Sequence, residues 1–529
     1  MTEVGFSSPM LAAAVAASVL AGCGGVGGRG GASGDSPHLS SVPIACAQLK
    51  SIATMPGITL DKVDFQAAGF VPPGGGTPVN QAFCRVQATA RPSLDSDIKF
   101  EVWMPLSSQW NGRFLAAGGG GNSGTIQYGR LVDGLDRGYA TLSTDNGHIS
   151  KGNIHEQSWA IGHPEKVIDF GYRAQTVTAV AGKDFVRAIY GKPAAKSYWI
   201  GCSQGGGKGL MQAQRYPENF DGIVAGAPVF DWVGSMFSPA WVSVKGMRDP
   251  KQLVPRSKLP MIHQAVLNSC DAQDGLLDGL LQEPGKCKPN LRTLACPTGT
   301  DSAQCLTPGQ ISSMERFYAP IKRPDGTSVF PGYPAGGELT SAWLGQTTPG
   351  DSSWSGLWTG PVHESASYDI VARLDVDGLT DFDFAKKKIS TIYDAVDPNL
   401  ERFAVRNGKI ILWQGMSDQL TSQLRTQEYV DSVKRTMGTD RTQSFMRAYF
   451  PPGVNHCRGG NGPIPDEYDM LSKVVEWVEK GEAPEALVGT HRTTSGVVDR
   501  TMPICPYPQV ARYDGKGDPN VASSFACKL

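Results

Sequence analysis

The sequence has almost no net charge and no long hydrophobic run beyond its first residues. Across 529 residues, 49 Lys and Arg nearly balance 50 Asp and Glu, which leaves a formal net charge of -1. Proteins that bind nucleic acid or anionic lipid surfaces are typically basic, so neither class is favoured. After residue 25 no apolar run reaches the length that crosses a bilayer. We therefore expect no nucleic-acid partner, and a membrane association only through a possible lipid at the N-terminus.

The cysteines lack the spacings of an intracellular zinc site. No CxxC or HxxxH pair occurs among the 11 Cys and 8 His. If Cys23 is set aside, ten cysteines remain, which is the even number that a disulfide framework needs. Pairing of neighbours offers four bridges: Cys46–Cys84, Cys270–Cys287, Cys296–Cys305 and Cys505–Cys527. It leaves Cys202 and Cys457, which lie far apart in the sequence.

The N-terminal segment differs in composition from the rest of the chain. A small apolar stretch, residues 10–21, ends in Leu20-Ala21-Gly22-Cys23, which resembles the lipobox of bacterial lipoprotein signals. The stretch MTEVGFSS before it contains Glu3 and no Lys or Arg, whereas an export signal usually begins with basic residues. The next residues, GGVGGRGGASGDSPHLSSVP, lack core-forming side chains. We expect a signal in residues 1–23 with lipidation of Cys23, a flexible linker in residues 24–43, and export to the periplasm, the outer membrane or the medium.

Apolar patterning indicates an α/β domain. Between residues 100 and 144, the runs FEVWMP, NGRFLAAGGGG and GYATLSTDNGH are typical of strands that end in loops. Residues 172–190 repeat apolar side chains at helical spacing, and SYWI, GKGLMQAQRY and FDGIVAGAP then indicate strand, helix and strand. This alternation favours a mostly parallel sheet covered by helices on both faces.

The alternation is interrupted between about residues 241 and 404, a stretch rich in turns and aromatic residues that holds four of the cysteines. It resumes with KIILWQ, SFMRAYF and the helical pattern DMLSKVVEWVEKG. The simplest organisation is one α/β domain in two parts, residues 44–240 and 405–529, interrupted by a lid domain of residues 241–404.

The segment Gly201-Cys202-Ser203-Gln204-Gly205 matches the G-x-S-x-G turn that presents a nucleophilic serine between a strand and a helix. Such a serine needs a base, and the base needs an orienting acid, in the chain order Ser, Asp or Glu, His. Asp418 closely follows the run KIILWQ, and His456 closely follows SFMRAYF. We therefore expect a triad of Ser203, Asp418 and His456 on loops that follow strands.

Two further features bear on this site. An acyl-transfer site needs N–H donors for the developing oxyanion, and the backbone of Gln204 and the glycine run at residues 118–121 are candidates. A bridge between Cys202 and Cys457 would tie Ser203 to His456 and limit the drift between them. Cys202 as the nucleophile, with His456 as its base, is the alternative.

The segment DAQDGLLDG, which follows Cys270, carries Asp271, Asp274 and Asp278. Carboxylates this close together repel one another, and a hard cation such as Ca²⁺ would relieve the repulsion. The spacing differs from that of an EF-hand, and a solvated acidic turn is the alternative.

These motifs resemble the tannase/feruloyl esterase family, which includes the bacterial hydrolase of mono(2-hydroxyethyl) terephthalate. The matching segments are NGRFLAAGGGG, ATLSTDNGH, FGYRAQT, YWIGCSQGG, QRYPENFDGIVAGAP, CDAQDGLLDG, GMSD, PGVNHC and CPYPQVARYDGKGD. The likeness extends from about residue 46 to residue 527. It implies an α/β-hydrolase core with a large inserted lid domain, and a serine esterase that acts on small esters of aromatic acids without an organic cofactor.

The resemblance also implies roles for single residues. It implies catalysis by Ser203, Asp418 and His456, and a Cys202–Cys457 disulfide beside the four neighbour pairings. It maps the oxyanion donors onto Gly121 and Gln204. It maps a structural Ca²⁺ ion in the lid onto side chains or carbonyls of five residues: Asp271, Asp274, Leu276, Asp278 and Leu280.

The substrate is the point at which the resemblance fails. In the terephthalate-ester enzyme, a Phe-Ser-Ala-Arg segment of the lid supplies an arginine for the substrate carboxylate. The comparable stretch here, HESASYDIVARLD, has no arginine in that pattern, although Arg373 is nearby. We expect gallate or hydroxycinnamate esters as substrates, cleaved through an acyl-enzyme. A terephthalate half-ester hydrolase is the alternative, and a catalytically silent surface lipoprotein that binds aromatics is the non-enzyme alternative.

Overall fold

The computed structural model describes residues 46–50, 55–150, 155–350 and 352–529. All of them belong to one compact unit of the chain. The expected signal and linker, with Cys23, lie outside the described residues.

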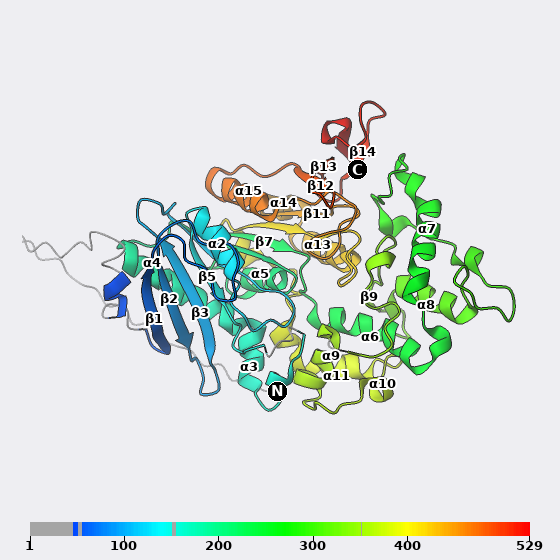
Figure 1. The fold of residues 1–529 in the computed structure, drawn as a ribbon, viewed down its shortest axis with the longest axis horizontal. Coiled ribbons are helices and arrows are strands. Elements are labelled where there is room, and N and C mark those ends of the chain that lie inside the picture. The colour runs from blue at the N-terminus through cyan, green and yellow to red at the C-terminus, as the bar shows by residue number, and fades with distance from the viewer. Residues whose placement is uncertain (1–45, 51–54, 151–154, 351) are drawn as a thin grey trace, which may run out of the picture. The chain divides into compact units, whose positions relative to one another are not determined.

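A nine-stranded sheet runs through the described residues (Figure 1). The first four strands in spatial order are paired antiparallel, and from the fourth strand onward every pairing is parallel. The spatial order is β1 (Ile58–Gln66), β2 (Phe83–Ala90), β3 (Ile98–Pro105), β5 (Ala140–Thr144), β4 (Arg113–Ala117), β6 (Lys196–Cys202), β7 (Gly222–Gly226), β10 (Lys409–Trp413) and β11 (Met446–Tyr449). The parallel part places the carboxyl ends of β4, β6, β7, β10 and β11 along one edge of the sheet.

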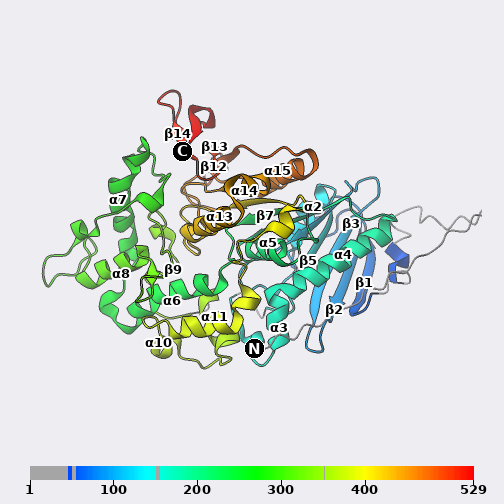
Figure 2. The same ribbon diagram turned by 180° about the vertical axis from the view of Figure 1, so that it is seen from behind.

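Helices cover both faces of this sheet, as the views from the two sides show (Figures 1 and 2). The side chains of a strand alternate between its faces, so Phe114 and Ala116 of β4 enter one core while Leu115 and Ala117 enter the other. Residues of α4 (Ala174–Tyr190), α5 (Gln204–Arg215) and α13 (Gln423–Met437) complete the first core. Residues of α15 (Glu467–Lys480) complete the second, and α2 (Tyr128–Asp136) packs on β5. The predicted α/β fold with a mostly parallel sheet is confirmed.

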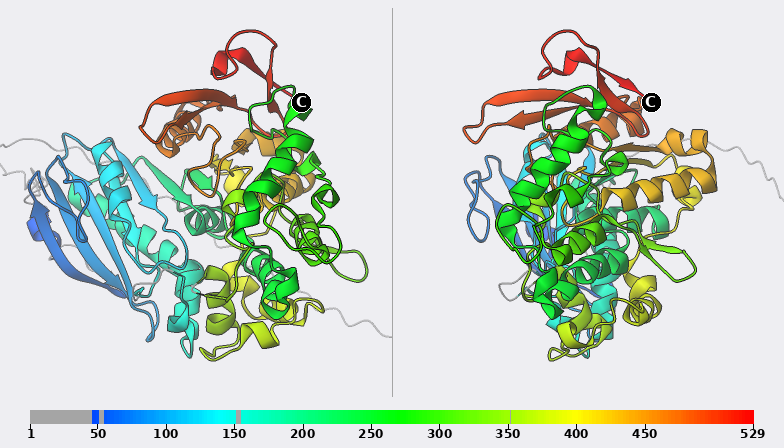
Figure 3. Two further views of the ribbon diagram at one scale, coloured as in Figure 1. Left: turned by 45° about the vertical axis from the view of Figure 1, so that its right-hand side comes forward. Right: turned by 90° about the vertical axis from the view of Figure 1, so that its right-hand side faces the viewer.

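A long segment between the neighbouring strands β7 and β10, drawn green to yellow in Figure 3, supplies most of a third large hydrophobic cluster. Ala160, Val167 and Phe170, which precede β7, also belong to this cluster. Its core holds the buried side chains of Trp343, Trp354 and Trp358. The elements of this segment are α6 (Trp232–Arg248), α7 (Leu259–Cys270), α8 (Pro308–Tyr318), β8 (Ile321–Lys322), β9 (Ser328–Phe330), α9 (Ser353–Leu357), α10 (Ile370–Arg373), α11 (Thr380–Tyr393) and α12 (Glu401–Ala404). The expected start of the lid at residue 241 falls inside α6, and the division into domains stays a prediction.

The remaining elements are two short helices and two C-terminal hairpins. α3 (Pro164–Ile168) precedes α4, and α14 (Thr439–Phe445) leads directly into β11. After α15 the chain forms two antiparallel hairpins, β12 (Leu487–Arg492) with β13 (Val498–Ile504) and β14 (Val510–Tyr513) with β15 (Phe525–Lys528). No helix of the described residues is long and apolar enough to span a membrane.

Candidate active site

Ser203 stands in a tight turn between the end of β6 and the start of α5. Its backbone angles, φ 62° and ψ -123°, lie in a region that residues with a side chain rarely occupy. Three backbone hydrogen bonds hold this conformation: Ser203 N donates to Gly226 O, and Gly207 N and Val229 N donate to Ser203 O, at 2.9 to 3.0 Å. The turn also needs glycine on both sides, because a Cβ on Gly201 or Gly205 would lie under 3 Å from backbone atoms. The glycines and hydrogen bonds of this turn thus place Ser203 at the carboxyl edge of the sheet.

Asp418 lies in the loop after β10, and its carboxylate is buried. Oδ1 accepts hydrogen bonds from Leu420 N and Thr421 N at 2.8 and 3.0 Å. Oδ2 accepts from Gln414 Nε2 at 2.7 Å and from Thr421 Oγ1 at 2.9 Å. Hydrogen bonds to an ionised carboxylate are stronger than those between neutral groups, so this set of donors fixes the direction in which the carboxylate points.

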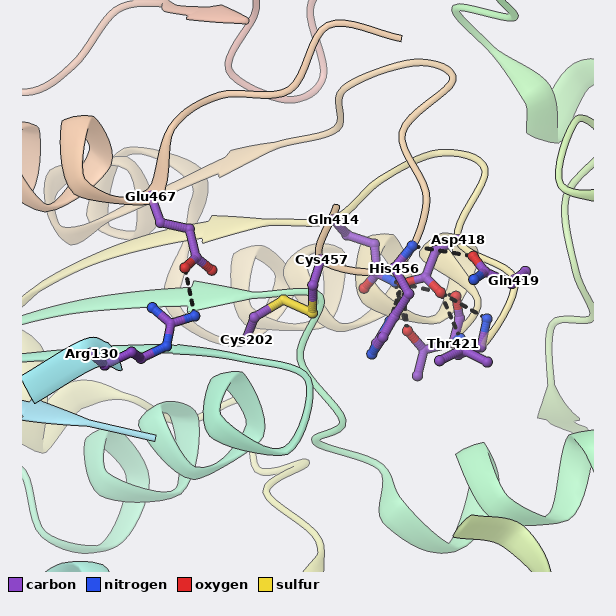
Figure 4. The surroundings of a disulfide bond; sticks show 10 residues. Arg130, Cys202, Gln414, Asp418, Gln419, Thr421, His456, Cys457 and Glu467 are labelled. Carbon is purple, nitrogen blue, oxygen red and sulfur yellow. Dashed lines mark hydrogen bonds and ion pairs between the residues drawn. A yellow bond between two sulfur atoms is a disulfide. The ribbon is translucent and has the colours of Figure 1, made fainter. Parts of the chain in front are cut away.

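His456 lies in the loop after β11, and its ring faces Asp418 (Figure 4). Its Nδ1 is 2.8 Å from Asp418 Oδ2. Because a carboxylate oxygen accepts, Nδ1 carries the proton of this bond, and in the neutral ring Nε2 is left as the basic nitrogen. The two loops are also joined through their backbones, by Met416 N to Pro451 O and Ser417 N to Val454 O at 2.9 and 3.0 Å. The structure therefore brings Asp418 and His456 together, because the strands that precede their loops, β10 and β11, are paired in the sheet.

A disulfide joins the residue before Ser203 to the residue after His456. Cys202 and Cys457 are bonded, with their Cα atoms 6.0 Å apart (Figure 4). Among the described residues no hydrogen bond joins the Ser203 hydroxyl to the His456 ring. Such bonds often tighten only when substrate binds. The disulfide holds the backbones of the two loops next to each other.

The glycine run after β4 packs against the N-terminus of α5. Gly205 N donates to Gly119 O at 2.9 Å, and a Cβ on Gly118 would lie 2.6 Å from Gly205 Cα. Gly121 follows in this turn with φ 59°. Gln204 is the first residue of α5, and the first N–H groups of a helix have no acceptor within it. Both expected oxyanion donors thus belong to segments that meet beside Ser203.

The four neighbour pairings of cysteines are confirmed. The structure contains Cys46–Cys84, Cys270–Cys287, Cys296–Cys305 and Cys505–Cys527. Together with Cys202–Cys457, they place each cysteine of the described residues in a disulfide.

The acidic segment after α7 carries partly buried carboxylates, and burial raises the pKa of Asp274 and of Asp278. Burial, with the charges of Asp278 and Asp271 adding to it, raises the pKa of Asp274 to about 6. Oδ2 of Asp278 is buried without a hydrogen-bond donor, although Arg500 Nη1 lies 3.8 Å away. Hard carboxylate oxygens under mutual repulsion fit the chemistry of Ca²⁺. Within the described ranges, however, no group of three or more His, Cys, Asp or Glu side chains converges to hold a metal ion.

Two supporting features were not predicted from the sequence. Gln414, the polar residue that ends the apolar run KIILWQ, donates to Asp418, and a polar side chain at that place was the available signal. Lys208 of α5 is buried, and its Nζ donates to Gly171 O at 2.5 Å and lies 4.7 Å from the centre of the Phe170 ring. Burial lowers the pKa of Lys208 to about 7. Nothing in the small-residue sequence around Lys208 indicates its burial.

Comparisons with known proteins extend over most of the chain. The family model described as tannase and feruloyl esterase matches residues 84–528. The chain is 34% identical to an uncharacterized esterase of Xanthomonas campestris over 92% of both proteins. It is 34% identical to the mono(2-hydroxyethyl) terephthalate hydrolase of Piscinibacter sakaiensis, over 82% of this chain and 81% of that protein. The solved structure of feruloyl esterase B from Aspergillus oryzae superposes with a TM-score of 0.84 at 27% identity, over 92% of this chain and 100% of that one.

Removal of the Cys202–Cys457 disulfide should lower stability more than removal of a disulfide that closes a short loop. Cys202→Ala/Cys457→Ala opens a link with a sequence separation of 255, whereas Cys296→Ala/Cys305→Ala opens one with a separation of 9. Loop-closure entropy rises with loop length, so we expect the first double variant to lose about 3–5 kcal/mol and the second about 2–3 kcal/mol. Guanidinium unfolding followed by tryptophan fluorescence measures both. An equal or larger loss in the second double variant would contradict the expectation.

Proposed function

Because the chain belongs to the tannase and feruloyl esterase family, we propose that Ser203, Asp418 and His456 form the catalytic triad with which it cleaves esters of aromatic acids. The chain is a carboxylic ester hydrolase, like the esterases among its relatives. The observation that carries the triad is the 2.8 Å contact of His456 Nδ1 with Asp418 Oδ2, beside the disulfide that ties this loop to Ser203.

In the first half of the reaction, Ser203 Oγ attacks the carbonyl carbon of the ester. The bond from Oγ to carbon forms while the hydroxyl proton passes to His456 Nε2, and the electron pair of the carbonyl moves onto its oxygen. When the carbonyl re-forms, the bond to the alcohol breaks, and the alcohol leaves with the proton from His456. Asp418 holds the imidazole in the correct tautomer and stabilises the imidazolium that forms. The product of this half is an acyl-enzyme on Ser203.

In the second half, water takes the place of the alcohol. His456 Nε2 accepts a proton from the water as its oxygen attacks the acyl carbon, and then returns the proton to Ser203 Oγ as the acid leaves. The oxyanion that forms in each half needs fixed N–H donors, which we assign to Gly121 and Gln204. Their support is the contact between the glycine turn and the N-terminus of α5.

The alternative with Cys202 as nucleophile does not hold. A thiolate is the reactive form of cysteine, and the sulfur of Cys202 is bonded to Cys457. The role of this pair is therefore to position Ser203 and His456.

For the acyl group we propose a gallate or hydroxycinnamate rather than a terephthalate half-ester. In the stretch HESASYDIVARLD, the charged side chains find partners inside the long segment between β7 and β10. His363 pairs with Asp381 at 3.1 Å, Glu364 pairs with Lys388, and the Arg373 guanidinium lies 4.8 Å from the centre of the Tyr368 ring. A half-ester would need a free cation for its carboxylate.

We also propose that residues 241–404 form a lid domain over the core. Its support is that this segment supplies most of a hydrophobic cluster distinct from the two cores on the faces of the sheet. The five disulfides indicate an exported protein, since thiols are kept reduced inside most cells. The further step, a lipid on Cys23 that anchors the protein in the outer membrane or on the periplasmic side, rests on the sequence motif.

We propose a structural Ca²⁺ site at the acidic segment. The carboxylates of Asp271, Asp274 and Asp278, with the carbonyls of Leu276 and Leu280, would hold the ion. When bound, Ca²⁺ would neutralise the repulsion between these carboxylates. The support is the raised pKa of Asp274 and of Asp278, for which burial is the largest cause and neighbouring carboxylates add to it. No step of ester hydrolysis passes through this site.

A fluorophosphonate probe should label Ser203, because it reacts with a serine that a neighbouring base activates. Ser203→Ala should lose the label and reduce kcat on p-nitrophenyl acetate by on the order of 10⁴-fold or more. Ser472→Ala, which changes an exposed serine of α15, should keep both the labelling and the kcat of the unmodified protein. Intact mass and peptide mapping locate the adduct. Labelling that survives in Ser203→Ala would remove Ser203 from the proposed role.

The substrate preference should appear in kcat/KM over a panel of methyl gallate, methyl ferulate, methyl p-coumarate and mono(2-hydroxyethyl) terephthalate. We expect kcat/KM for a gallate or hydroxycinnamate ester to exceed that for the half-ester by at least about tenfold. The carboxylate of the half-ester would lose its water on binding without gaining a cationic partner. A half-ester that is turned over fastest would contradict the proposed acyl group.

Calcium should stabilise the protein against heat. At a free concentration about 100-fold above Kd, we expect a gain of about 2–3 kcal/mol, and a chelator should reverse it. Mg²⁺ should stabilise less, because it gives up its waters reluctantly. Asp274→Asn should lose the response, whereas Asp518→Asn, in an exposed turn, should keep it. Calorimetry in the presence and absence of Ca²⁺ measures the shift, and an unchanged melting temperature would exclude the site.

A further inference from the structure

The four residues that follow β5, Asp145-Asn146-Gly147-His148, have no role in the chemistry described above. They form the end of the segment ATLSTDNGH, and the side chains of Asp145, Asn146 and His148 are each no more than 4% exposed. Burial of a polar side chain is unfavourable unless the side chain makes hydrogen bonds. The hydrogen-bond partners of these side chains therefore show which part of the structure they hold in place.

The partners of Asn146 and His148 lie in the glycine turn after β4. Asn146 Nδ2 donates to Ser123 O at 2.8 Å, and His148 Nε2 lies 2.7 Å from Asn122 O. A carbonyl oxygen only accepts, so the ring donates its proton to Asn122. Two consecutive peptide carbonyls, directly after Gly121, are thus fixed by side chains from the neighbouring strand's loop.

Gly121 itself occupies a turn closed by the hydrogen bond from Ser123 N to Gly120 O at 3.2 Å. Its positive φ of 59° is a conformation that glycine adopts without strain. The side chains that hold residues 122 and 123 therefore restrict how the whole turn can rotate. That rotation determines where the Gly121 N–H points.

The two donors are in turn held by rigid elements. Gln175 Nε2 of α4 donates to Asn146 Oδ1 at 2.5 Å. The His148 ring stacks on Trp159, with ring centres 4.1 Å apart and planes 17° from parallel. Burial lowers the pKa of His148 to about 4, so at neutral pH the ring carries one proton, the one given to Asn122 O. Asn146 and His148 are therefore both fixed in position, and His148 is also fixed in its protonation state at neutral pH.

The two loops also pack closely at Gly124, where there is no space for a side chain. A Cβ on Gly124 would lie 2.3 Å from His148 O and 2.7 Å from His148 Cδ2. Gly124 N donates to Ser150 Oγ at 2.8 Å, which adds a third link between the loops. Residues 122, 123 and 124 of the turn thus each contact the segment that follows β5.

We propose that Asn146 and His148 are positioning residues for ester hydrolysis, which fix the Gly121 N–H at the place where the oxyanion develops. The inference rests on the proposed role of Gly121 and extends it to the residues that aim the donor. Both side chains act through the turn, because they are buried and hydrogen-bonded to its carbonyls. Their effect lies in the transition state, because an oxyanion donor acts only when it is preorganised.

Asn146→Gly tests the first residue without backbone strain, since glycine tolerates the φ of 61° that Asn146 adopts. We expect kcat/KM for p-nitrophenyl acetate to fall about 10- to 100-fold, less than the loss on removing a donor outright. Asn407→Gly is the matched control, because Asn407 also has φ 61° and lies in the loop before β10. It should leave kcat/KM unchanged. Unaltered kcat/KM in a folded Asn146→Gly protein would overturn the proposal.

His148→Phe and His148→Gln separate hydrogen bonding from packing. Phe keeps the stacking ring and removes the N–H, so we expect the same loss as for Asn146→Gly. Gln carries an amide that can donate to Asn122 O, so it should recover at least several-fold of that loss. A melting temperature and a circular dichroism spectrum establish that each variant is folded. A Gln variant no more active than the Phe variant would count against the donor role of His148.

A tetrahedral adduct distinguishes positioning from general stability. Phenylboronic acid forms such an adduct on an active serine, whereas ferulate binds only as a ground-state ligand. In the Asn146→Gly and His148→Phe proteins, inhibition by phenylboronic acid should weaken in proportion to kcat/KM, and inhibition by ferulate should stay within about twofold. Equal weakening of both would overturn the proposal. Turnover that persists in Ser203→Ala would instead overturn the proposed function, so the two failures are separable.

Discussion

The Cys202–Cys457 disulfide joins the end of β6 to the loop after β11, which are separated in the sequence by the whole segment between β7 and β10. On one side it fixes the end of β6, where Ser203 adopts its strained conformation. On the other side it fixes the loop that carries His456. In the proposed mechanism the Ser203 hydroxyl and the His456 ring must approach within hydrogen-bond distance, and a displacement of one ångström is enough to reduce the rate markedly. A covalent link adjacent to both residues limits that displacement more than side-chain packing alone.

The sheet supplies the rest of the geometry. Parallel strands end at one edge, so the loops after β4, β6, β10 and β11 meet there without long connections. Asp418, His456, Ser203 and the glycine turn each follow a different strand. The Asp418 carboxylate is held by Gln414 and Thr421, and the glycine turn is held by Asn146 and His148. Asp418 and the glycine turn thus each have their own set of buried partners.

The long segment between β7 and β10 is joined to these same loops. Ser422 Oγ donates to Gly332 O at 2.5 Å, and Arg425 Nε of α13 donates to Asp231 Oδ2 at 2.8 Å at the start of α6. Gly337 lies against Ser417, the residue before Asp418, so closely that a Cβ would be 3.1 Å from its carbonyl oxygen. A change in the packing of this segment would therefore reach the loop that carries Asp418 directly.

The sequence by itself determined the features that depend on neighbours in the chain. The elbow at Ser203, the strand–helix alternation, the order of Asp418 and His456, and the four short-range cysteine pairs follow from local spacing and from the conformations that glycine allows. Only the tertiary structure decided which distant groups support them. The burial of Lys208 depends on the packing of α5 against residues 170 and 171, and the contacts of Asn146 and His148 with residues 122 and 123 depend on the pairing of β5 with β4. Hydrophobic periodicity tells which face of a strand is buried, but it does not tell which strand lies beside it. The hydrogen bonds of Asn146 and His148 form only because the loops after two neighbouring strands meet.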